Sequence, residues 1–511
     1  MITDILIIGG GITARRAAKI AAERYNVLLI SDGGGSSPFI HGLNVPLLPE
    51  DSSELLYEDT IKSGAYQNVP SLAKALSLGA IAVKEELSDR FDKASNGSYE
   101  LLKPLGSSVK RVAGIHGRTG VVTLQELTAS KRYKELASTR AISLIKKEDR
   151  IIGAKAYVRS SGKFISIYAR AVLIATGGFG GIFPFSTNSR DIGGDGIAMA
   201  FMAGAELCDM EFIQYEPTVA VAPHALIGKS VITTMLFEGA VMRNRFGDRF
   251  MDEQVGKDKL SLGIAEEILR GGGTENGGIY YDMTAVPEEM LLGKYKDYFE
   301  RYNRQGIDIR KTPVEIAPAP HTTMGGIRID EYARTTVKGL FAAGEAAGGV
   351  HGANRLGGNA GLEVFVFGDI AGNSLVEFLD GDKETANGSF FPTAESEASD
   401  VPFDAVRLRG SLEGICKKSL GVIKNERSLT EANYTVDGII KKAMEHKDSF
   451  EACRLFNDAL TARLLIAAAL ERKESIGGHV RSDGKAHIGE RYTVTLIKDN
   501  NSIKVQRRSL L

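Results

Sequence analysis

The sequence predicts an α/β protein in which a Rossmann-like dinucleotide-binding domain is interrupted by an α+β capping insertion and followed by a C-terminal helical domain. Three observations lead to this prediction. A glycine-rich turn joins an apolar strand to an alanine-rich helix within the first 22 residues. A second apolar strand, residues 171–176, also runs into a glycine-rich turn. A more polar stretch then separates these segments from further glycine-rich runs after residue 320.

The first thirty residues read as strand, turn, helix and strand in immediate succession. The turn follows the pattern GxGxxA with Gly9, Gly11 and Ala14. In this pattern the first glycine permits a tight turn, the second lets the backbone approach a pyrophosphate, and the alanine lets the helix pack closely on the strand. The N–H groups and partial positive charge at the helix N-terminus favour a bound phosphate. The alternative interpretation of this turn is an ordinary strand–helix connection that binds no dinucleotide.

Two side chains follow the second strand, at the place where a dinucleotide fold meets a ribose. They are Ser31 and Asp32, about twenty residues after the turn, as the pattern requires. The loop at residues 33–38 comes next and contains Ser36 and Ser37. Such a loop wraps a cofactor with its backbone N–H groups or is a flexible surface loop.

Composition excludes several classes of protein. The chain has 511 residues with 63 Lys and Arg against 64 Asp and Glu, so no nucleic-acid partner is expected. The three cysteines are far apart and form no CxxC pair, which argues against a disulfide framework or a cluster site. No membrane span is expected, because no apolar run approaches about 18 residues. No metal site is expected either, since the cysteines form no ligand cluster. We expect a cytoplasmic protein, with peripheral attachment to the inner face of a membrane as the alternative.

The distribution of apolar runs and glycine-rich turns along the sequence divides the chain into predicted domains. The strand at residues 171–176 is followed by Gly193-Gly194-Asp195-Gly196, which opens an apolar helix, and buried apolar strands are not evident from about residue 211 to residue 318. Apolar spacing of three and four between residues 407 and 473 predicts helices, and residues 492–505 predict a hairpin. The predicted limits are 1–209 and 320–380 for the dinucleotide-binding domain, 210–319 for the capping domain, 400–484 for the helical domain and 485–511 for the hairpin and tail.

At this point the residues resemble a known family, the flavoprotein subunits of succinate dehydrogenase and fumarate reductase together with L-aspartate oxidase. The similarity spans nearly the whole chain. The blocks that carry it are Ala175-Thr-Gly-Gly-Phe, Met210-Glu-Phe-Ile-Gln214, His321-Thr-Thr-Met-Gly-Gly326, the run from Gly344-Glu345 to His351-Gly-Ala-Asn-Arg-Leu-Gly-Gly-Asn359, and Arg472-Lys-Glu-Ser475.

The resemblance implies FAD as the cofactor. Gly9, Gly11 and Ala14 would contact the pyrophosphate, and Ser31 and Asp32 would contact the ribose. Ser36 and Ser37 would belong to the loop that wraps the flavin. Asp195 and Glu345 match family positions that touch FAD, and Ala360 and Gly361 lie where the family has Ser-Leu. Without the resemblance, Glu345 could equally be a solvated helix start.

Attachment of the flavin is expected to be non-covalent. Many respiratory members of the family bind FAD through a His, and the equivalent position here is about Ser36. His41 lies nearby in the sequence and is assigned no role.

The family reaction is hydride transfer between flavin and a dicarboxylate, with proton transfer at the neighbouring carbon. Family members use two His, a Thr and two Arg for it. His321 and Arg355 match two of these positions, and a planar guanidinium suits a carboxylate because it binds bidentately. The alternatives are a turn-capping role for His321 and a structural ion pair for Arg355.

The other three positions depart from the family pattern. Glu216 stands where the family has His, Phe237 stands where it has Thr, and the run after Ala240 is shortened. We expect the proton-donating Arg to be lost with that run, and Arg243 and Arg245 are the nearest substitutes unless they face solvent. A carboxylate beside a substrate carboxylate would cost about 4 kcal/mol at about 4 Å and an effective dielectric constant of about 20. The substrate is then no ordinary dicarboxylate, or Glu216 is turned away or protonated.

Three functional hypotheses follow. The first is an oxidoreductase of succinate dehydrogenase/fumarate reductase type acting on a small carboxylate, with an atypical active site. The second is an L-aspartate oxidase-like enzyme, in which Glu216 pairs with a substrate amine; the family loop Glu-Gly-Gly-His-Ser is missing here at residues 105–108. The third is an FAD-binding protein without dicarboxylate turnover. Since no cluster or haem ligands are evident, an electron partner would be a separate iron-sulfur subunit or a soluble carrier.

Overall fold

A parallel sheet forms the centre of the molecule. The computed structural model describes residues 1–382, 395–397, 403–500 and 502–510. The sheet has the order β17-β10-β1-β2-β6, with β1 Ile5–Ile8, β2 Val27–Ile30, β6 Lys134–Leu136, β10 Ala171–Ile174 and β17 Leu340–Ala342. All four residues of β1, β2 and β10 are buried, as expected for a parallel sheet that is covered on both faces.

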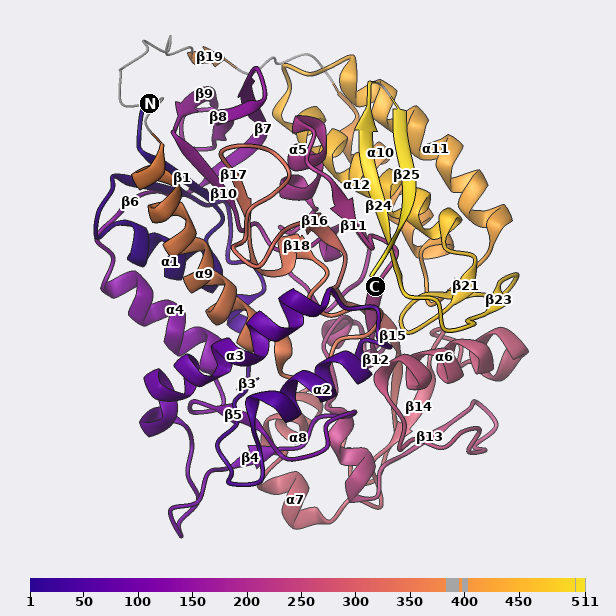
Figure 1. The fold of residues 1–511 in the computed structure, drawn as a ribbon. Coiled ribbons are helices and arrows are strands. Elements are labelled where there is room, and N and C mark those ends of the chain that lie inside the picture. Colours follow the sequence, from indigo (N-terminus) through magenta and orange to yellow (C-terminus); the bar gives the residue numbers. More distant parts are fainter. Residues whose placement is uncertain (383–394, 398–402, 501, 511) are drawn as a thin grey trace.

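Helices and a small antiparallel sheet cover this centre (Figure 1). Helix α1 (Ile12–Ala21) packs along α9 (Asn359–Gly381), while the meander β7 Thr139–Lys147, β8 Arg150–Val158 and β9 Lys163–Tyr168 contacts β2 and β10. Strand β19 (Glu395–Glu397) pairs with β9. The remaining elements here are α2 Ser53–Ser63, α3 Pro70–Leu87, α4 Thr119–Ala129, β3 Gly42–Asn44, β4 Leu101–Leu102 and β5 Val112–Gly114.

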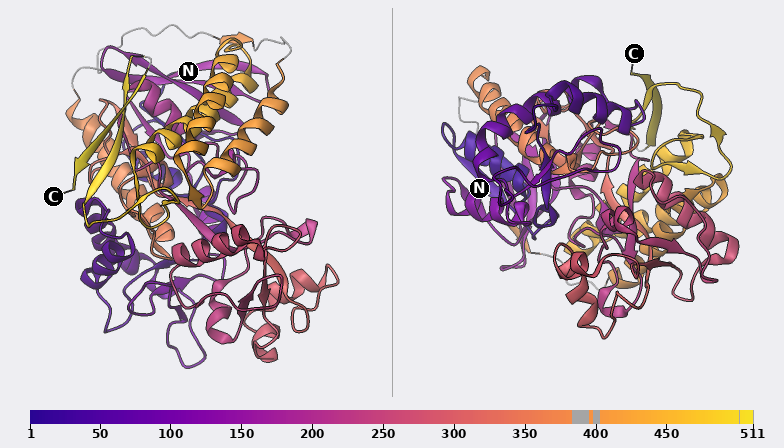
Figure 2. Two further views of the ribbon diagram at one scale, coloured as in Figure 1. Left: turned by 90° about the vertical axis from the view of Figure 1, so that its right-hand side faces the viewer. Right: turned by 90° about the horizontal axis from the view of Figure 1, so that it is seen from below.

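The polar stretch after residue 210 contains a four-stranded antiparallel sheet. Its order is β12-β15-β14-β13, with β12 Ile213–Ala220, β13 Val241–Arg243, β14 Ile279–Asp282 and β15 Val314–Thr323. Helices α6 Lys257–Glu267, α7 Glu288–Leu292 and α8 Lys296–Asn303 accompany it. A separate apolar core holds this insertion together, and Figures 1 and 2 show it gathered at one end of the molecule in rose colours.

The sequence-based expectation was that this stretch lacks buried apolar strands. Every residue of β12 is buried, but the strand is not an apolar run, because Gln214, Glu216 and Thr218 are polar. A search for apolar runs does not find such a strand, since its polar side chains bond to neighbours inside the protein. Strand β15 also crosses the limit predicted at residue 319, so the division of the chain into domains stays a prediction.

The C-terminal part combines three helices with the predicted hairpin. Helices α10 Ala405–Ser419, α11 Glu426–Met444 and α12 Phe450–Glu471 lie side by side in both figures, and α5 (Asp195–Ala203) lies between α12 and β7. The hairpin of β24 Tyr492–Asp499 and β25 Ser502–Ser509 joins a sheet of order β18-β16-β11-β24-β25, with β11 Leu207–Cys208, β16 Gly326–Arg328 and β18 Ala347–Gly348. It is therefore not an independent tail. The limit predicted at residue 400 lies outside the described residues.

The remaining strands have two residues each. They are β20 Ile423–Lys424, β21 Glu474–Ser475, β22 Val480–Arg481 and β23 Lys485–Ala486. Among the helices that the structure describes, none has both the length and the apolar character needed to cross a membrane.

A fully buried arginine joins the C-terminal part to the start of the insertion. Arg472 donates from Nε to Glu211 Oε1 at 2.5 Å, from Nη1 to Glu474 Oε1 at 3.2 Å and from Nη2 to the Tyr492 carbonyl at 3.1 Å. Its side chain is 0 % exposed, and Asp209 lies 3.4 Å away. Burial raises the pKa of Asp209 to about 6 and that of Glu211 to about 7, although Arg472 opposes both shifts.

We expect Arg472→Met to lower the free energy of unfolding by about 3–5 kcal/mol, because buried carboxylates lose their cation. The folded pKa values of Asp209 and Glu211 exceed their unfolded values of about 4, so these groups destabilise the fold increasingly as the pH rises from about 4 to about 7. Loss of Arg472 enlarges that penalty. The deficit, measured by urea unfolding, is therefore larger at pH 8 than at pH 5.5.

The matched control is Arg507→Met. Arg507 is 42 % exposed and pairs with the surface carboxylate of Glu471, so its loss costs at most about 1 kcal/mol. Equal deficits for the two variants, or a deficit of Arg472→Met that does not change with pH, would contradict the assignment.

Candidate active site

A cavity of about 1030 Å³ is lined by residues of both the nucleotide-binding part and the insertion. Its walls come from segments throughout the chain, including the turn after β1, the loop after β2, strands β12 and β15, and the N-terminus of α9. Of the sequence-predicted site residues, those that line it are Gly9, Gly11, Ser31, Asp32, Ser36, Ser37, Asp195, His321, Glu345, Arg355, Ala360 and Gly361. Ala14 does not line it, because its side chain is 0 % exposed inside the core.

The turn at Gly9 requires glycine for two reasons. Its φ is +131°, and a Cβ there would come within 2.2 Å of the Ala175 carbonyl oxygen. At Gly11 a Cβ would approach Ser37 Oγ to 2.8 Å. That hydroxyl accepts a hydrogen bond from Ile12 N at 3.0 Å. Ser37 therefore takes one of the helix N–H groups that the sequence assigned to phosphate, and it fixes the loop against the turn.

Asp32 is held by two arginines. Its carboxylate accepts from Arg140 Nη1 at 3.1 Å and from Arg159 Nε at 2.5 Å. Burial opposes ionisation of Asp32, but the hydrogen bonds from Arg159 and Arg140 outweigh it and keep its pKa below the usual value. A ribose would thus meet a carboxylate whose position is already fixed, and the ribose role of Ser31 and Asp32 stays a prediction.

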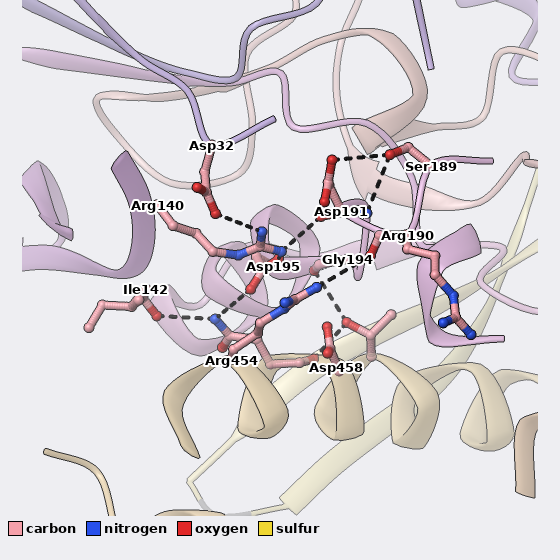
Figure 3. A network of polar contacts seen from close by, with 12 residues as sticks. Asp32, Arg140, Ile142, Ser189, Arg190, Asp191, Gly194, Asp195, Arg454 and Asp458 are labelled. Carbon is pink, nitrogen blue, oxygen red and sulfur yellow. Dashed lines mark hydrogen bonds and ion pairs between the residues drawn. The ribbon is translucent and has the colours of Figure 1, made fainter. Parts of the chain in front are cut away.

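Arg140 also binds Asp195, so the two predicted FAD residues share one cation. Nη2 of Arg140 lies 2.5 Å from Asp195 Oδ2, and Figure 3 shows its guanidinium between Asp32 and Asp195. Helix α12 lies below this pair and supplies Asn457, whose Nδ2 donates to Asp195 Oδ1 at 3.3 Å. The same helix supplies Thr461, whose hydroxyl donates to the Gly194 carbonyl at 3.2 Å.

The loop predicted to wrap the flavin is connected through Asn188 to strand β15. Ser36 Oγ donates to Asn188 Oδ1 at 2.8 Å, and Asn188 Nδ2 donates to the His321 carbonyl at 2.9 Å. His41 also lines the cavity, with Nδ1 3.2 Å from the Gly117 carbonyl oxygen. The side chain at the position where the family has its covalent His is thus a serine hydroxyl bonded to protein.

Glu345 and the start of α9 close the cavity near its middle. Glu345 Oε1 accepts from Thr323 N at 3.0 Å, and burial raises the pKa of this carboxyl group. A Cβ at Gly361 would lie 2.5 Å from the Gly42 carbonyl oxygen, so the glycine that replaces the family Leu permits close contact with β3. Thr176 Oγ1 lines the same region and has no hydrogen-bond partner among the described residues.

These features fit a bound dinucleotide. The cavity volume suits a large cofactor, the glycine turn lets it approach the backbone, and Thr176, which lines the cavity, has a hydroxyl without a partner among the described residues. The lining is therefore compatible with FAD.

The far end of the cavity carries His321, Arg355 and Glu216. Strands β12 and β15 are antiparallel neighbours with Glu216 opposite Ala319, which brings Glu216 Oε2 to 3.9 Å from His321 Nε2. His321 Nδ1 lies 2.7 Å from Thr187 Oγ1. Removal from bulk water, together with the charges of Lys257 and Arg355, holds the pKa of His321 well below its usual value. His321 is therefore neutral at neutral pH.

Arg355 lies in the cavity wall and forms no ion pair with any described residue, although the charges of Glu345, Glu216 and Glu363 act on it. It is 7 % exposed, Nη1 donates to the Leu356 carbonyl at 3.2 Å, and Nε has no hydrogen-bond partner in the described part of the chain. Burial lowers the pKa of its guanidinium. A buried cation with an unused N–H group is a binding site for an anion.

Glu216 has a partner that the sequence did not predict. Lys257, the first residue of α6, forms an ion pair with it, and both side chains line the cavity. Glu216 is thus neither turned away nor dependent on a proton. The like-charge penalty expected from the sequence is offset by the lysine, because the pair as a whole is neutral.

The other departures from the family pattern lie away from the cavity. Arg243 is paired with Asp282 at 2.8 Å, the guanidinium of Arg245 lies over Phe246, and Phe237 is 51 % exposed. None of these residues lines the cavity. In the loop at residues 105–108, where the family Glu-Gly-Gly-His-Ser motif is missing, Ser108 donates from N and Oγ to Asp59 Oδ2 at 2.9 and 2.8 Å.

Sequence reasoning missed Lys257 and Arg140. Arg140 lies on β7 and carries no motif. Lys257 stands at the start of a helix, where a positive charge opposes the helix dipole; this unfavourable placement was the available signal. Lys229, Tyr298 and Arg301 also line the cavity and were missed.

The fold and the site define a flavin-dependent oxidoreductase, and comparison with known proteins gives its family. Residues 4–360 match the family described as FAD binding domain, and residues 409–510 match that described as fumarate reductase flavoprotein C-term. The chain therefore belongs to the succinate dehydrogenase/fumarate reductase family of FAD-dependent flavoproteins. FAD is its cofactor.

Three similar proteins illustrate the range of this family. The chain is 33 % identical over 515 residues to a subunit of the fumarate reductase (CoM/CoB) of Methanothermobacter marburgensis, with 94 % of each chain covered. It is 31 % identical over 400 residues to L-aspartate oxidase of Clostridium perfringens, covering 74 % of this chain and 88 % of that one. The structure of Mycobacterium smegmatis Sdh1 in complex with UQ1 has a TM-score of 0.88 at 26 % identity, with 100 % and 94 % coverage.

We expect Arg140→Met to weaken FAD binding to the apoprotein by tenfold or more, because two buried carboxylates would lose their shared cation. A tenfold change corresponds to about 1.4 kcal/mol of binding free energy. Arg159→Met is the matched control: Arg159 is 42 % exposed and pairs with Asp32 alone, so its loss should change affinity by less than about threefold. Titration of apoprotein followed by flavin fluorescence measures both. Equal losses would show that Asp195 does not need Arg140.

We expect acid precipitation of the purified protein to leave all of its FAD in the supernatant, because Ser36 occupies the position of the covalent His and its hydroxyl is bonded to Asn188. The absorbance of supernatant and pellet measures this. A yellow pellet would show a covalent bond, and His41→Ala would then test whether His41 forms it.

Proposed function

We propose that the chain transfers hydride between FAD and a small carboxylate that binds at the His321–Arg355 end of the cavity. The observation that carries this proposal is the state of Arg355: a buried cation that lines the cavity, forms no ion pair among the described residues, and has no acceptor for its Nε there. A substrate carboxylate supplies both the charge and the acceptor.

When bound, FAD supplies the two-electron redox chemistry. The chain's own residues would do the rest. Arg355 binds and orients one carboxylate through its guanidinium. His321 is neutral and contributes a hydrogen bond instead of a charge, with its ring oriented by Thr187. Cap residues of the insertion close the site against water, which strengthens each of these interactions.

Arg355 is the cation proposed to bind one carboxylate in the inner cavity. Lys257 and Glu216 cancel and His321 is neutral, while the carboxyl groups of Glu345 and Glu363 also line the cavity and act on the charge of Arg355. A second carboxylate of a dicarboxylate would lie toward the rim, where the exposed Lys229 and the half-buried Arg301 line the cavity. This arrangement supports a substrate with two acidic groups of which only one is deeply buried.

The aspartate oxidase hypothesis receives less support. It relied on Glu216 as the partner of a substrate amine, and that carboxylate is already paired with Lys257. A substrate amine would have to displace the lysine. The third hypothesis, FAD binding without turnover, relied on the loss of a cationic proton donor, and Lys257 places a cation in the same cavity.

The electron partner is proposed to be a separate iron-sulfur subunit or a soluble carrier. One similar protein is by its name one subunit of a fumarate reductase, and the described part of this chain has no group of His, Cys, Asp and Glu side chains that could hold a metal ion. Location in the cytoplasm, with or without peripheral membrane attachment, stays an expectation.

The decisive experiment starts from anaerobically reduced holoprotein. Reoxidation of the flavin by fumarate supports the proposal. Failure with fumarate, combined with bleaching of the oxidised enzyme by L-aspartate and peroxide release in air, supports the oxidase. No response to either, with flavin still bound, supports FAD binding without dicarboxylate turnover.

We expect Arg355→Ala to lower kcat/KM for the active carboxylate by about 10³-fold or more, since the site loses a bidentate, desolvated charge interaction that is worth several kcal/mol. Arg243→Ala is the control, because Arg243 pairs with Asp282 outside the cavity. Steady-state kinetics on proteins of equal flavin content measures the difference. Turnover that survives Arg355→Ala would remove Arg355 from the substrate site.

A further inference from the structure

The Lys257–Glu216 ion pair lies in the substrate part of the cavity, and nothing in the proposed binding of a carboxylate by Arg355 requires it. Glu216 comes from β12, where it is 5 % exposed, and Lys257 comes from the first turn of α6, which packs on β12. The Lys257 side chain is 22 % exposed. The ammonium group is therefore held inside the protein wall but reaches the cavity and its water.

Lys257 is a cation with a transferable proton beside the predicted catalytic residues. Lys257 and Arg355 are the two cations whose charges depress the pKa of His321. Among the groups at this end, His321 is neutral and has no imidazolium proton to give. The guanidinium of Arg355 is engaged with the Leu356 carbonyl and with the substrate carboxylate. An ammonium group, by contrast, is a common general acid in enzymes.

The position of Lys257 is also unfavourable on its own. A lysine at the first position of a helix places positive charge against the positive end of the helix dipole, which is unfavourable. Glu216 offsets this cost and holds the ammonium group at the cavity. An ion pair that is maintained against local electrostatics, beside a substrate site, points to function more than to stability.

We propose that Lys257 is the proton donor to the substrate carbon next to the one that exchanges hydride, and that Glu216 is its positioning residue. The inference rests on the proposed hydride transfer. In the reductive direction, hydride forms a C–H bond at one alkene carbon, and the π-electron pair moves to the other carbon. That pair takes a proton from Lys257 Nζ, whose N–H electrons remain on nitrogen, so a neutral amine results. The amine regains its proton from water in the cavity, and the oxidative direction reverses each step.

The test uses Lys257→Ala holoenzyme and small ammonium ions. We expect kcat for the active carboxylate to fall by about 10²–10⁴-fold, as for loss of a general acid. Lys259→Ala is the matched control: Lys259 lies two residues away on α6, is exposed and does not line the cavity. Its kcat should change by less than twofold.

Added ammonium ions separate proton donation from charge. We expect trimethylammonium to raise the kcat of Lys257→Ala by at least tenfold and tetramethylammonium to leave it unchanged, since the two cations are close in size and only the first carries an N–H proton. Equal rescue by both cations would overturn the proposal in favour of a purely electrostatic role. If neither trimethylammonium nor methylammonium restores any activity, proton donation by Lys257 is also overturned.

Binding of malonate, which does not turn over, gives a readout that is independent of activity. Calorimetric titration should show that Lys257→Ala binds malonate within tenfold of wild type, because Arg355 is intact. For Glu216→Gln we expect kcat to fall by about tenfold while malonate affinity is unchanged or increased, since a negative charge has been removed from the site. A residue with only a structural role would lower both together.

Two failures are distinguishable. Wild-type holoenzyme that turns over neither fumarate nor L-aspartate overturns the proposed function and this inference with it. Wild-type enzyme that is active, with a Lys257→Ala variant whose kcat stays within threefold, overturns the inference alone.

Discussion

A single buried guanidinium connects the loop after β2 with the start of α5 and, through Asp195, with helix α12. Arg140 binds Asp32 after β2 and Asp195 at the first residue of α5. Asp195 in turn accepts from Asn457 on α12. Each carboxylate is buried, so each would be costly without this cation. The parts that surround the cofactor end of the cavity are thus held in one arrangement by shared charge, as Figure 3 shows.

The substrate end is governed by a different balance. Lys257, Arg355 and Glu216 lie around His321; Lys257 is paired with Glu216, and Arg355 forms no ion pair among the described residues. Under the proposed function, Arg355 binds the carboxylate and Lys257 moves the proton, so the two tasks fall to different side chains.

Membership of the family defines the cofactor and the class of reaction, and the side chains at the cavity define the substrate. Relatives with the same architecture include an L-aspartate oxidase as well as one component of a fumarate reductase, so the fold is compatible with more than one chemistry. By the resemblance read from the sequence, the glycine turns, Glu345, His321 and Arg355 match the family pattern, and Glu216 and Phe237 in the insertion depart from it.

The sequence by itself determined the fold class, the cofactor FAD and the glycine turn at Gly9, because these depend on short-range patterns: apolar runs, glycine spacing and ordered motif blocks. It also located His321 and Arg355 within such blocks. It did not reveal the strands of the insertion, because β12 buries polar side chains that are satisfied only by neighbours. It also misjudged Glu216 as an isolated negative charge. Only the tertiary structure brought Lys257 to Glu216 and Arg140 to Asp32 and Asp195. These partners are 41, 108 and 55 residues apart in the chain, and the energy of a charge depends on what is near it in space, not on its neighbours in sequence.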